Sequence, residues 1–258
     1  MEGSFKNPIG QQPKQEKISQ KNLNQLSENL KVLFGDFSEL KRYEAWIKNQ
    51  VENNKLETLS TGPSAVKTAL CVKDWPDIII KRFDKGDAKF WYEKEKREFP
   101  IVFKQLGNRF LPETKFTEIS DSIDVDNKYY VLQDKITGIH QEQTTDEARE
   151  FINESMNEEQ IEEEYVKNPD NWIKLRGEIL KKKLNTEQLK MVQLEAKDLC
   201  DSLKELEKGY HINDLDFFIT QDGHIKVIDF QLHNNDSYLP NSDGFAEGSE
   251  EIRIFFNL

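Results

Sequence analysis

The sequence predicts an α+β protein of two lobes, in which a small antiparallel-sheet N-lobe is followed by a reduced, mostly helical C-lobe. Three observations predict this. Short runs rich in β-branched and aromatic residues alternate with turn residues over 69–136, one long amphipathic pattern covers 185–208, and two further strand-like runs follow at 217–230. With 258 residues, the chain is long enough to bury a substantial core.

The segment before the sheet is predicted to be helical. Residues 1–16 are rich in Gly, Pro, Gln and Lys and lack periodic apolar positions, which is typical of a flexible tail. Over 17–54, apolar residues recur at helical spacing on both sides of Gly35, which predicts an N-terminal extension of two amphipathic helices. The N-lobe and hinge are then expected at 55–138, and the C-lobe at 139–258.

The N-lobe is predicted to run in the order hairpin, helix, hairpin. "ALCVKD" and "IIIKRF" form the first hairpin around a Trp-Pro-Asp turn at 75–77, and "AKFWYEKEKREF" forms the helix. "ETKFTEI" at 113–119 and "KYYVLQDKI" at 128–136 form the second hairpin. This order predicts the small antiparallel sheet of the N-lobe.

The C-lobe pattern begins with an acidic stretch. Between 141 and 164 ten acidic residues face one base, Arg149, which indicates a solvated helical flap. Asn185 and Gln188 then match a capped helix start, and the helix is predicted to end at Lys208 with Gly209 in the C′ position. A hairpin with a Gln-Asp-Gly turn follows immediately.

Composition excludes several classes of function. The net charge of −12 and pI near 5.0, without a basic patch interleaved with aromatic residues, argue against nucleic-acid and anionic-membrane partners. Cys71 and Cys200 have neither disulfide-framework nor metal-site spacing. No apolar signal region or membrane-length stretch is present, so a cytoplasmic protein is expected, although export without a recognisable signal stays open.

The order of four features carries the functional signal. Lys81 ends an apolar strand, the acids Glu95 and Glu98 follow on a helix, "YYVLQDKITG" runs into Gly138, and a long helix leads to "GYHINDLDFFITQDGHIKVIDF". In this order, over roughly 55–230, the chain resembles the protein kinase-like superfamily, including its small bacterial and aminoglycoside-phosphotransferase-type branches. The resemblance implies phosphoryl transfer that depends on ATP and on Mg²⁺ or Mn²⁺.

The resemblance also assigns roles to nucleotide-binding residues. Lys81 would hold the α/β phosphates, and Glu98, or Glu95 in its place, would orient that lysine. The main chain from Gln133 to Lys135 would face the adenine, with Leu132 as gatekeeper. Each of these roles is what the family's pattern implies for this chain.

The metal-binding and catalytic positions are implied by two counts that disagree. Asp229 matches the metal-binding acid of the Asp-Phe-Gly motif, although Gln231 replaces the glycine. Counted forward from the end of the long helix, "GYHINDL" resembles the family's Gly-x-x-His-Arg-Asp-Leu pattern, which places the catalytic aspartate at Asp214. Counted backward from Asp229, the family's second metal ligand falls on Asp216 and its catalytic position falls on His211. We favour a short loop, with Asp214 catalytic and Asp216 on the metal; replacement of the aspartate by His211 is the alternative.

Two departures from the family keep other functions open. The phosphate-covering segment "LSTGPSAVKTALCV" holds one glycine, Gly62, and only 28 residues follow Phe230, too few for a peptide-docking platform of the usual kind. The acceptor is expected to be a protein hydroxyl or a small-molecule hydroxyl. The alternatives are a pseudokinase that serves as a nucleotide- or protein-binding module, nucleotidyl transfer on the same fold, and a scaffold without a ligand.

Overall fold

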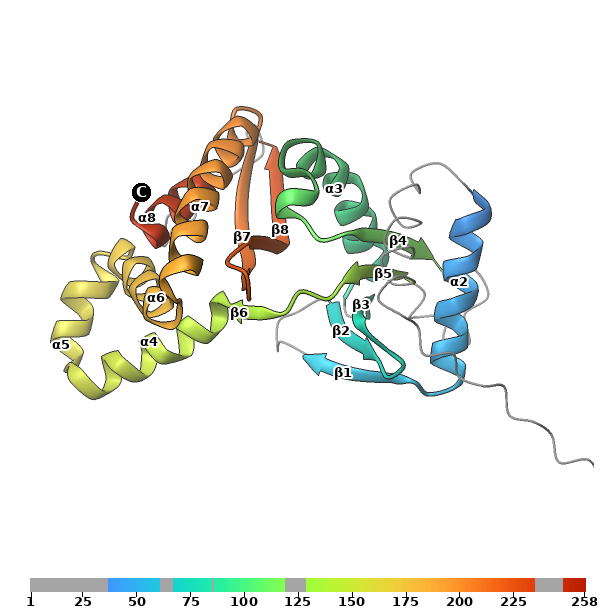
Figure 1. The fold of residues 1–258 in the computed structure, drawn as a ribbon, viewed down its shortest axis with the longest axis horizontal. Helices are drawn as coiled ribbons and strands as arrows, with labels where there is room; N and C mark the ends of the chain where they lie inside the picture. Colours follow the sequence, from blue (N-terminus) through green and yellow to red (C-terminus); the bar gives the residue numbers. More distant parts are fainter. Residues whose placement is uncertain (1–36, 61–66, 85, 119–128, 235–247) are drawn as a thin grey trace, which may run out of the picture.

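The computed structural model describes residues 37–60, 67–84, 86–118, 129–234 and 248–258. It confirms the predicted α+β layout of two lobes, with a small antiparallel sheet in one lobe and a mostly helical second lobe. In Figure 1 the segment that carries β6 passes from the sheet to the helices. None of the helices in these ranges combines the length and apolar character needed to cross a bilayer.

The N-lobe sheet has five antiparallel strands in the order β1-β2-β3-β5-β4. They are β1 (Leu56–Ser60), β2 (Lys67–Val72), β3 (Trp75–Phe83), β4 (Thr114–Glu118) and β5 (Tyr129–Asp134). Both predicted hairpins are present, but the first turn is at Lys73 and Asp74 and not at 75–77. Trp75 instead starts β3 and packs edge-on against Trp46, with ring centroids 5.7 Å apart. That apolar contact outweighs the turn preference of the Pro-Asp pair.

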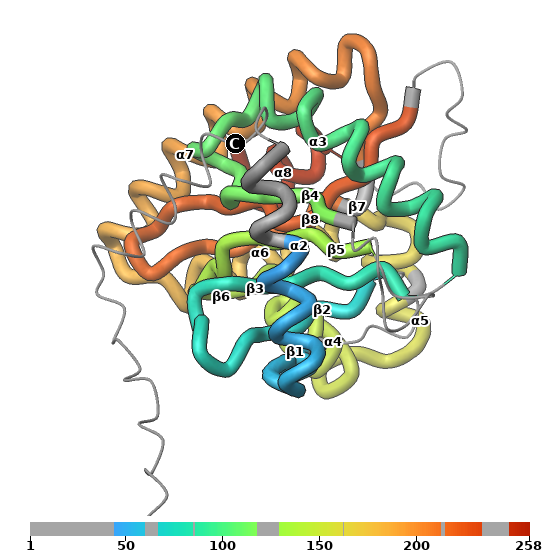
Figure 2. Tube along the Cα trace, turned by 90° about the vertical axis from the view of Figure 1, so that its right-hand side faces the viewer, coloured from blue at the N-terminus to red at the C-terminus, as the bar shows by residue number. Residues whose placement is uncertain are grey.

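The two faces of the sheet have different partners because side chains alternate along a strand. Ile78 and Ile80 of β3 pack with the fully buried Ile47 of α2 (Phe37–Glu52), whereas Lys81 and Phe83 point to the other face. Figure 2 shows α2 lying across the sheet. This is the second of the two predicted N-terminal helices; the first lies outside the described residues.

Helix α3 (Ala88–Phe110) covers the other face and connects the lobes. Asp87 caps its start by accepting from the Phe90 amide. The helix is longer than predicted, continues through Pro100, and leaves helical geometry only at Gly107, where φ is 59°. Its apolar face contacts β3 and β5 in the first lobe and α7 and β8 in the second. One apolar core therefore runs through both lobes.

The C-lobe consists of helices around a three-stranded sheet of order β6-β7-β8. Its elements are β6 (Gly138–His140), α4 (Gln141–Ser155), α5 (Glu158–Ile161), a π-helical turn (Glu162–Val166), α6 (Asp170–Lys183), α7 (Thr186–Glu207), β7 (Tyr210–Thr220), β8 (Ile225–Asn234) and α8 (Gly248–Phe256). The predicted acidic flap is partly docked, since α4 buries Ala148 and Ile152, whereas α5 buries no residue. The capping box of Asn185 and Gln188 is confirmed at the start of α7.

Three features of this lobe differ from the sequence prediction. Strands β7 and β8 have 11 and 10 residues, so all of "GYHINDL" after Gly209, predicted to be a loop, lies within β7. Gly223 has the left-handed φ of 86° expected in the hairpin turn, but Gly209 has no positive φ after α7. Helix α8 was not predicted; it buries Ile252, Phe255 and Phe256 against α6 and α7.

We predict that Gly177→Ala destabilises the protein by loosening α8 from α6. A Cβ at Gly177 would lie 1.8 Å from the Phe255 carbonyl oxygen, so the backbones must separate. The free energy of unfolding, measured by urea denaturation, should fall by about 1 to 3 kcal/mol, the usual cost of overpacking. The matched control is Gly209→Ala, whose Cβ meets nothing within 4 Å and should change stability by less than about 0.5 kcal/mol. Equal stability of the two variants would contradict this packing.

Candidate active site

Lys67 at the start of β2 is the centre of an ion cluster between the lobes. Its Nζ lies 2.7 Å from Glu95 Oε2 on α3 and 2.8 Å from Asp229 Oδ1 on β8. The side chains of Lys67 and Glu95 are each only 16 % exposed. Burial alone would lower the pKa of Lys67, but Asp229 and Glu95 raise it above its ordinary value. The ammonium therefore keeps its charge although it is largely removed from water.

Lys81, the lysine predicted from the sequence, lies on the same sheet face. In the β2–β3 register, Lys67 of β2 lies opposite Phe83, and Lys81 of β3 lies opposite Ala69. The Lys81 Nζ donates to the main-chain carbonyl of Ile228, 2.6 Å away, in the residue that precedes Asp229. Burial, together with the charge of Lys67, lowers the pKa of Lys81 although Asp229 is near. Its assignment to the phosphates stays a prediction.

Of the two acids predicted on α3, Glu95 forms the ion pair with a lysine, Lys67. Glu98, named first from the sequence, lies about one turn further along α3 and accepts from the Leu232 amide at 3.5 Å. Burial raises the pKa of Glu98 above its ordinary value. The orienting role expected of an acid on this helix therefore fits Glu95, the substitute named from the sequence, better than Glu98.

Asp216 and Asp229, the two predicted metal ligands, are direct partners in the β7–β8 register, at a bulge in the ladder. Burial would raise the pKa of Asp229, but Lys67 and Lys81 reverse the effect and hold it below its ordinary value. Its Oδ1 also accepts from the Phe230 amide at 3.0 Å. The Asp229 side chain is 38 % exposed, so part of the carboxylate is accessible to a ligand.

His140 is a site residue that sequence reasoning missed. Its Nε2 lies 2.8 Å from Asp216 Oδ1, but the two groups are not aligned as a hydrogen bond. Both atoms are buried, and neither forms a hydrogen bond with any other group in the described part of the structure. The ring packs on Phe218, with centroids 4.5 Å apart. The only available signal was a three-residue strand, β6, which is too short to recognise from periodicity.

A divalent cation fits the pair Asp216 and Asp229. A buried Asp216 oxygen without an aligned donor is a suitable ligand atom, and Mg²⁺ commonly takes one or two carboxylates together with phosphate oxygens. Within the described ranges no three His, Cys, Asp or Glu residues are grouped so that they could hold a metal by themselves. The arrangement thus suits a cation that arrives with a phosphate ligand.

The predicted catalytic residue cannot be placed as fully. Asp214 belongs to β7, but its side chain lies outside the described part of the structure. The alternative residue, His211, is in the same strand opposite His233. Both candidates therefore come from a paired strand and not from an open loop.

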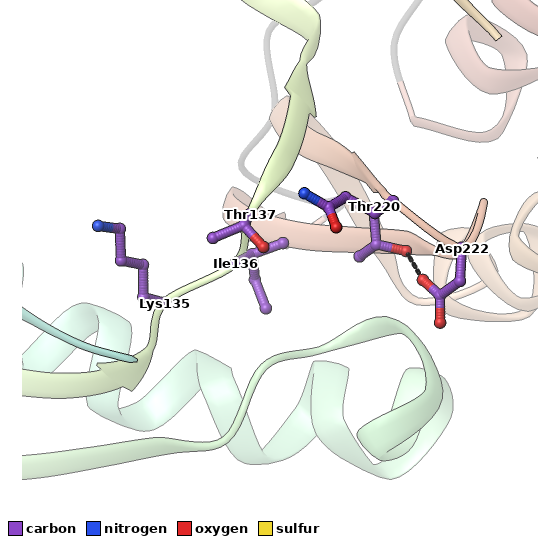
Figure 3. A pocket seen from close by; sticks show the side chains of 6 residues that line it. Lys135, Ile136, Thr137, Thr220 and Asp222 are labelled. Carbon is purple, nitrogen blue, oxygen red and sulfur yellow. Dashed lines mark hydrogen bonds between the residues drawn. The ribbon is translucent and has the colours of Figure 1, made fainter. Parts of the chain in front are cut away.

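The hinge adjoins a pocket of about 520 Å³ that Figure 3 shows from close by. Lys135, Ile136 and Thr137 line one side, and Thr220, Gln221 and Asp222 of the β7–β8 turn line the other. The Lys135 amide already donates to the Asp77 carbonyl at 2.8 Å. The Gln133 side chain donates to Thr114 Oγ1 at 3.1 Å. The predicted adenine contacts of Gln133 to Lys135 stay a prediction.

Comparison with known proteins gives structural likenesses at low scores. No family model and no curated protein matches the chain. The gentamicin complex of APH(2″)-IIa is 15 % identical over 87 % of this chain and 83 % of that chain, with a TM-score of 0.32. The streptomycin–ATP ternary complex of APH(2″)-IIa is 16 % identical over 87 % and 82 %, with a TM-score of 0.30. Scores of this size do not carry an activity from one protein to another.

We predict that Glu95→Gln costs more stability than Glu98→Gln. Removing the Glu95 charge leaves the Lys67 ammonium with a weaker partner, and the free energy of unfolding at neutral pH should fall by about 1 to 3 kcal/mol. Urea denaturation from pH 3 to 8 provides the measurement. The two glutamates lie on one helix, so each variant is the control for the other.

Glu98→Gln should be as stable as wild type, or more stable, at neutral pH. The raised pKa means that folded protein binds this proton more tightly than unfolded protein. The free energy of unfolding of the wild type therefore falls as the pH rises from the ordinary carboxyl range of about 4 through the raised pKa of Glu98. The Gln variant has no carboxyl group at this position and does not show this decrease in stability. A larger loss in Glu98→Gln than in Glu95→Gln would contradict the arrangement.

Proposed function

We propose that the chain binds ATP with a divalent cation at the junction of its lobes and transfers the γ-phosphoryl group to a hydroxyl of a protein or small molecule. The observation that carries the proposal is the ion cluster of Lys67, Glu95 and Asp229, with Lys81 and Asp216 beside it. A lysine oriented by an acid, next to paired carboxylates, provides the groups that phosphoryl transfer uses. The kinase-like order of the elements supports the same reaction.

The residues would act by positioning and by charge, since phosphoryl transfer needs little covalent chemistry from a protein. Asp216 and Asp229 would hold the cation, which when bound neutralises charge on the phosphate oxygens. Glu95 keeps the Lys67 ammonium in one place. Asp214, two residues before Asp216, would accept the proton of the attacking hydroxyl, as the sequence prediction has it.

A second candidate is a nucleotide- or protein-binding module without turnover. The observation that favours it is the pairing of Tyr210 through Asn213 with Gln231 through Asn234, which makes a strand of the predicted catalytic loop. An enzyme must place its hydroxyl-activating group beside the metal ligands and still leave space for the acceptor. Binding and turnover therefore need separate tests.

For binding, we predict that ATP with Mg²⁺ raises the thermal midpoint of the wild type. A ligand at a hundredfold excess over its dissociation constant stabilises the folded state by about 2.7 kcal/mol, roughly 5 to 10 °C for a chain of this size. Asp229→Asn should lose most of this rise, because a neutral amide holds a cation poorly. Differential scanning fluorimetry with and without EDTA measures both.

The control for this experiment is Asp201→Asn, which changes an exposed acid on α7 that lies 3.9 Å from the Lys204 ammonium. It should respond to nucleotide like the wild type. If millimolar ATP with Mg²⁺ or Mn²⁺ leaves the midpoint of folded wild type unchanged, the proposed function is wrong.

For turnover, we predict slow hydrolysis of ATP to ADP, with water in place of the acceptor. Asp214→Asn should lower kcat by about 10² to 10⁴-fold, the usual contribution of a general base, while its ATP-induced midpoint shift stays that of the wild type. A coupled ADP assay measures the rate. A wild type that binds ATP but neither hydrolyses it nor phosphorylates itself or a panel of hydroxyl acceptors would instead support the binding module.

A further inference from the structure

We infer that Lys67 of β2, and not the lysine of β3, is the cation that binds the nucleotide phosphates. Lys81 is then a positioning residue that ties β3 to β8 through the Ile228 carbonyl. The inference rests on the proposed function and reassigns the role that the sequence resemblance gives to Lys81.

The first argument is the partner that each lysine has. A lysine that binds phosphate must be fixed, because a free four-carbon side chain loses conformational entropy when it is held by a ligand. Lys67 is fixed by Glu95 on α3 and by Asp229 on β8, at 2.7 and 2.8 Å. Lys81 donates a hydrogen bond to the main-chain carbonyl of Ile228, which carries no net charge. Only Lys67 has the acid partner on α3.

The second argument is access. Lys67 begins β2 and lies within "LSTGPSAVKTALCV", the segment that the sequence predicts to cover the phosphates. Its side chain is 16 % exposed, whereas the whole Lys81 residue is 8 % exposed and lies within β3. An ammonium also has three N–H donors. Glu95 and Asp229 take two of them, which leaves one for a phosphate oxygen while the side chain stays held.

The test compares ATP with adenosine as ligands, because only ATP has phosphates. Isothermal titration calorimetry with Mg²⁺ would be applied to Lys67→Met, Lys81→Met and the control Lys73→Met. Lys73 lies on the β2–β3 turn and is half exposed, paired with Glu57 at 3.2 Å. Lys67→Met should weaken the affinity for ATP at least about tenfold, which is more than Lys81→Met does. It should leave the affinity for adenosine unchanged. Lys73→Met should bind both ligands like the wild type.

A second variant covers the case in which Lys67→Met does not fold. Lys67→Arg keeps the charge and both acid partners, so it should fold and should lower the ATP-to-adenosine affinity ratio only slightly. ATP binding lost in Lys81→Met but retained in Lys67→Met would overturn the inference and leave the proposed function intact. An equal loss of ATP and adenosine binding in Lys67→Met would also overturn it, since the role would then be structural. A wild type that binds neither ligand overturns the proposed function as well.

Discussion

The pairing of one buried ammonium with two carboxylates constrains both lobes of this protein. Removing a charged group from water costs several kcal/mol, and this cost is offset only when its partners stay at hydrogen-bond distance. Lys67, Glu95 and Asp229 come from β2, α3 and β8, so the sheet, the connecting helix and the hairpin must keep a fixed arrangement. A shift of any of these elements by about 1 Å would break a charge-assisted bond.

The apolar core supports that arrangement from the same helix. Phe99 is four residues after Glu95 and therefore lies on the same face of α3. Its ring contacts Phe116 of β4 with centroids 5.6 Å apart, and it stacks on Phe230 of β8 at 6.5 Å. Packing of Phe99 between the two lobes thus sets the rotation of α3, and that rotation aims Glu95 at Lys67. Apolar burial provides most of the stability, and the apolar packing and the ion cluster together fix the geometry.

Sequence patterns predicted much of the fold because they report local rules. The capping box at Asn185 and Gln188 depends only on residues three apart, and it was found correctly. The choice between Lys67 and Lys81 does not depend on local rules. Both face the same side of the sheet, and the ion pair of Lys67 with Glu95, a residue 28 positions away on α3, distinguishes them. Helix α8 was missed because its nine residues are fewer than the window of about 11 to 18 residues over which helical periodicity is judged.

Strand β6, which no sequence pattern indicated, connects the end of the N-lobe sheet to Asp216. Gly138 follows the hinge with a φ of 152°, and a Cβ there would lie 2.0 Å from the Ile219 carbonyl oxygen, so only glycine lets β6 approach β7. Two residues later His140 contacts Asp216. Asp216 faces Asp229 in the β7–β8 register, and Asp229 pairs with Lys67. Direct contacts therefore connect β6 with the ion cluster of Lys67, Glu95 and Asp229.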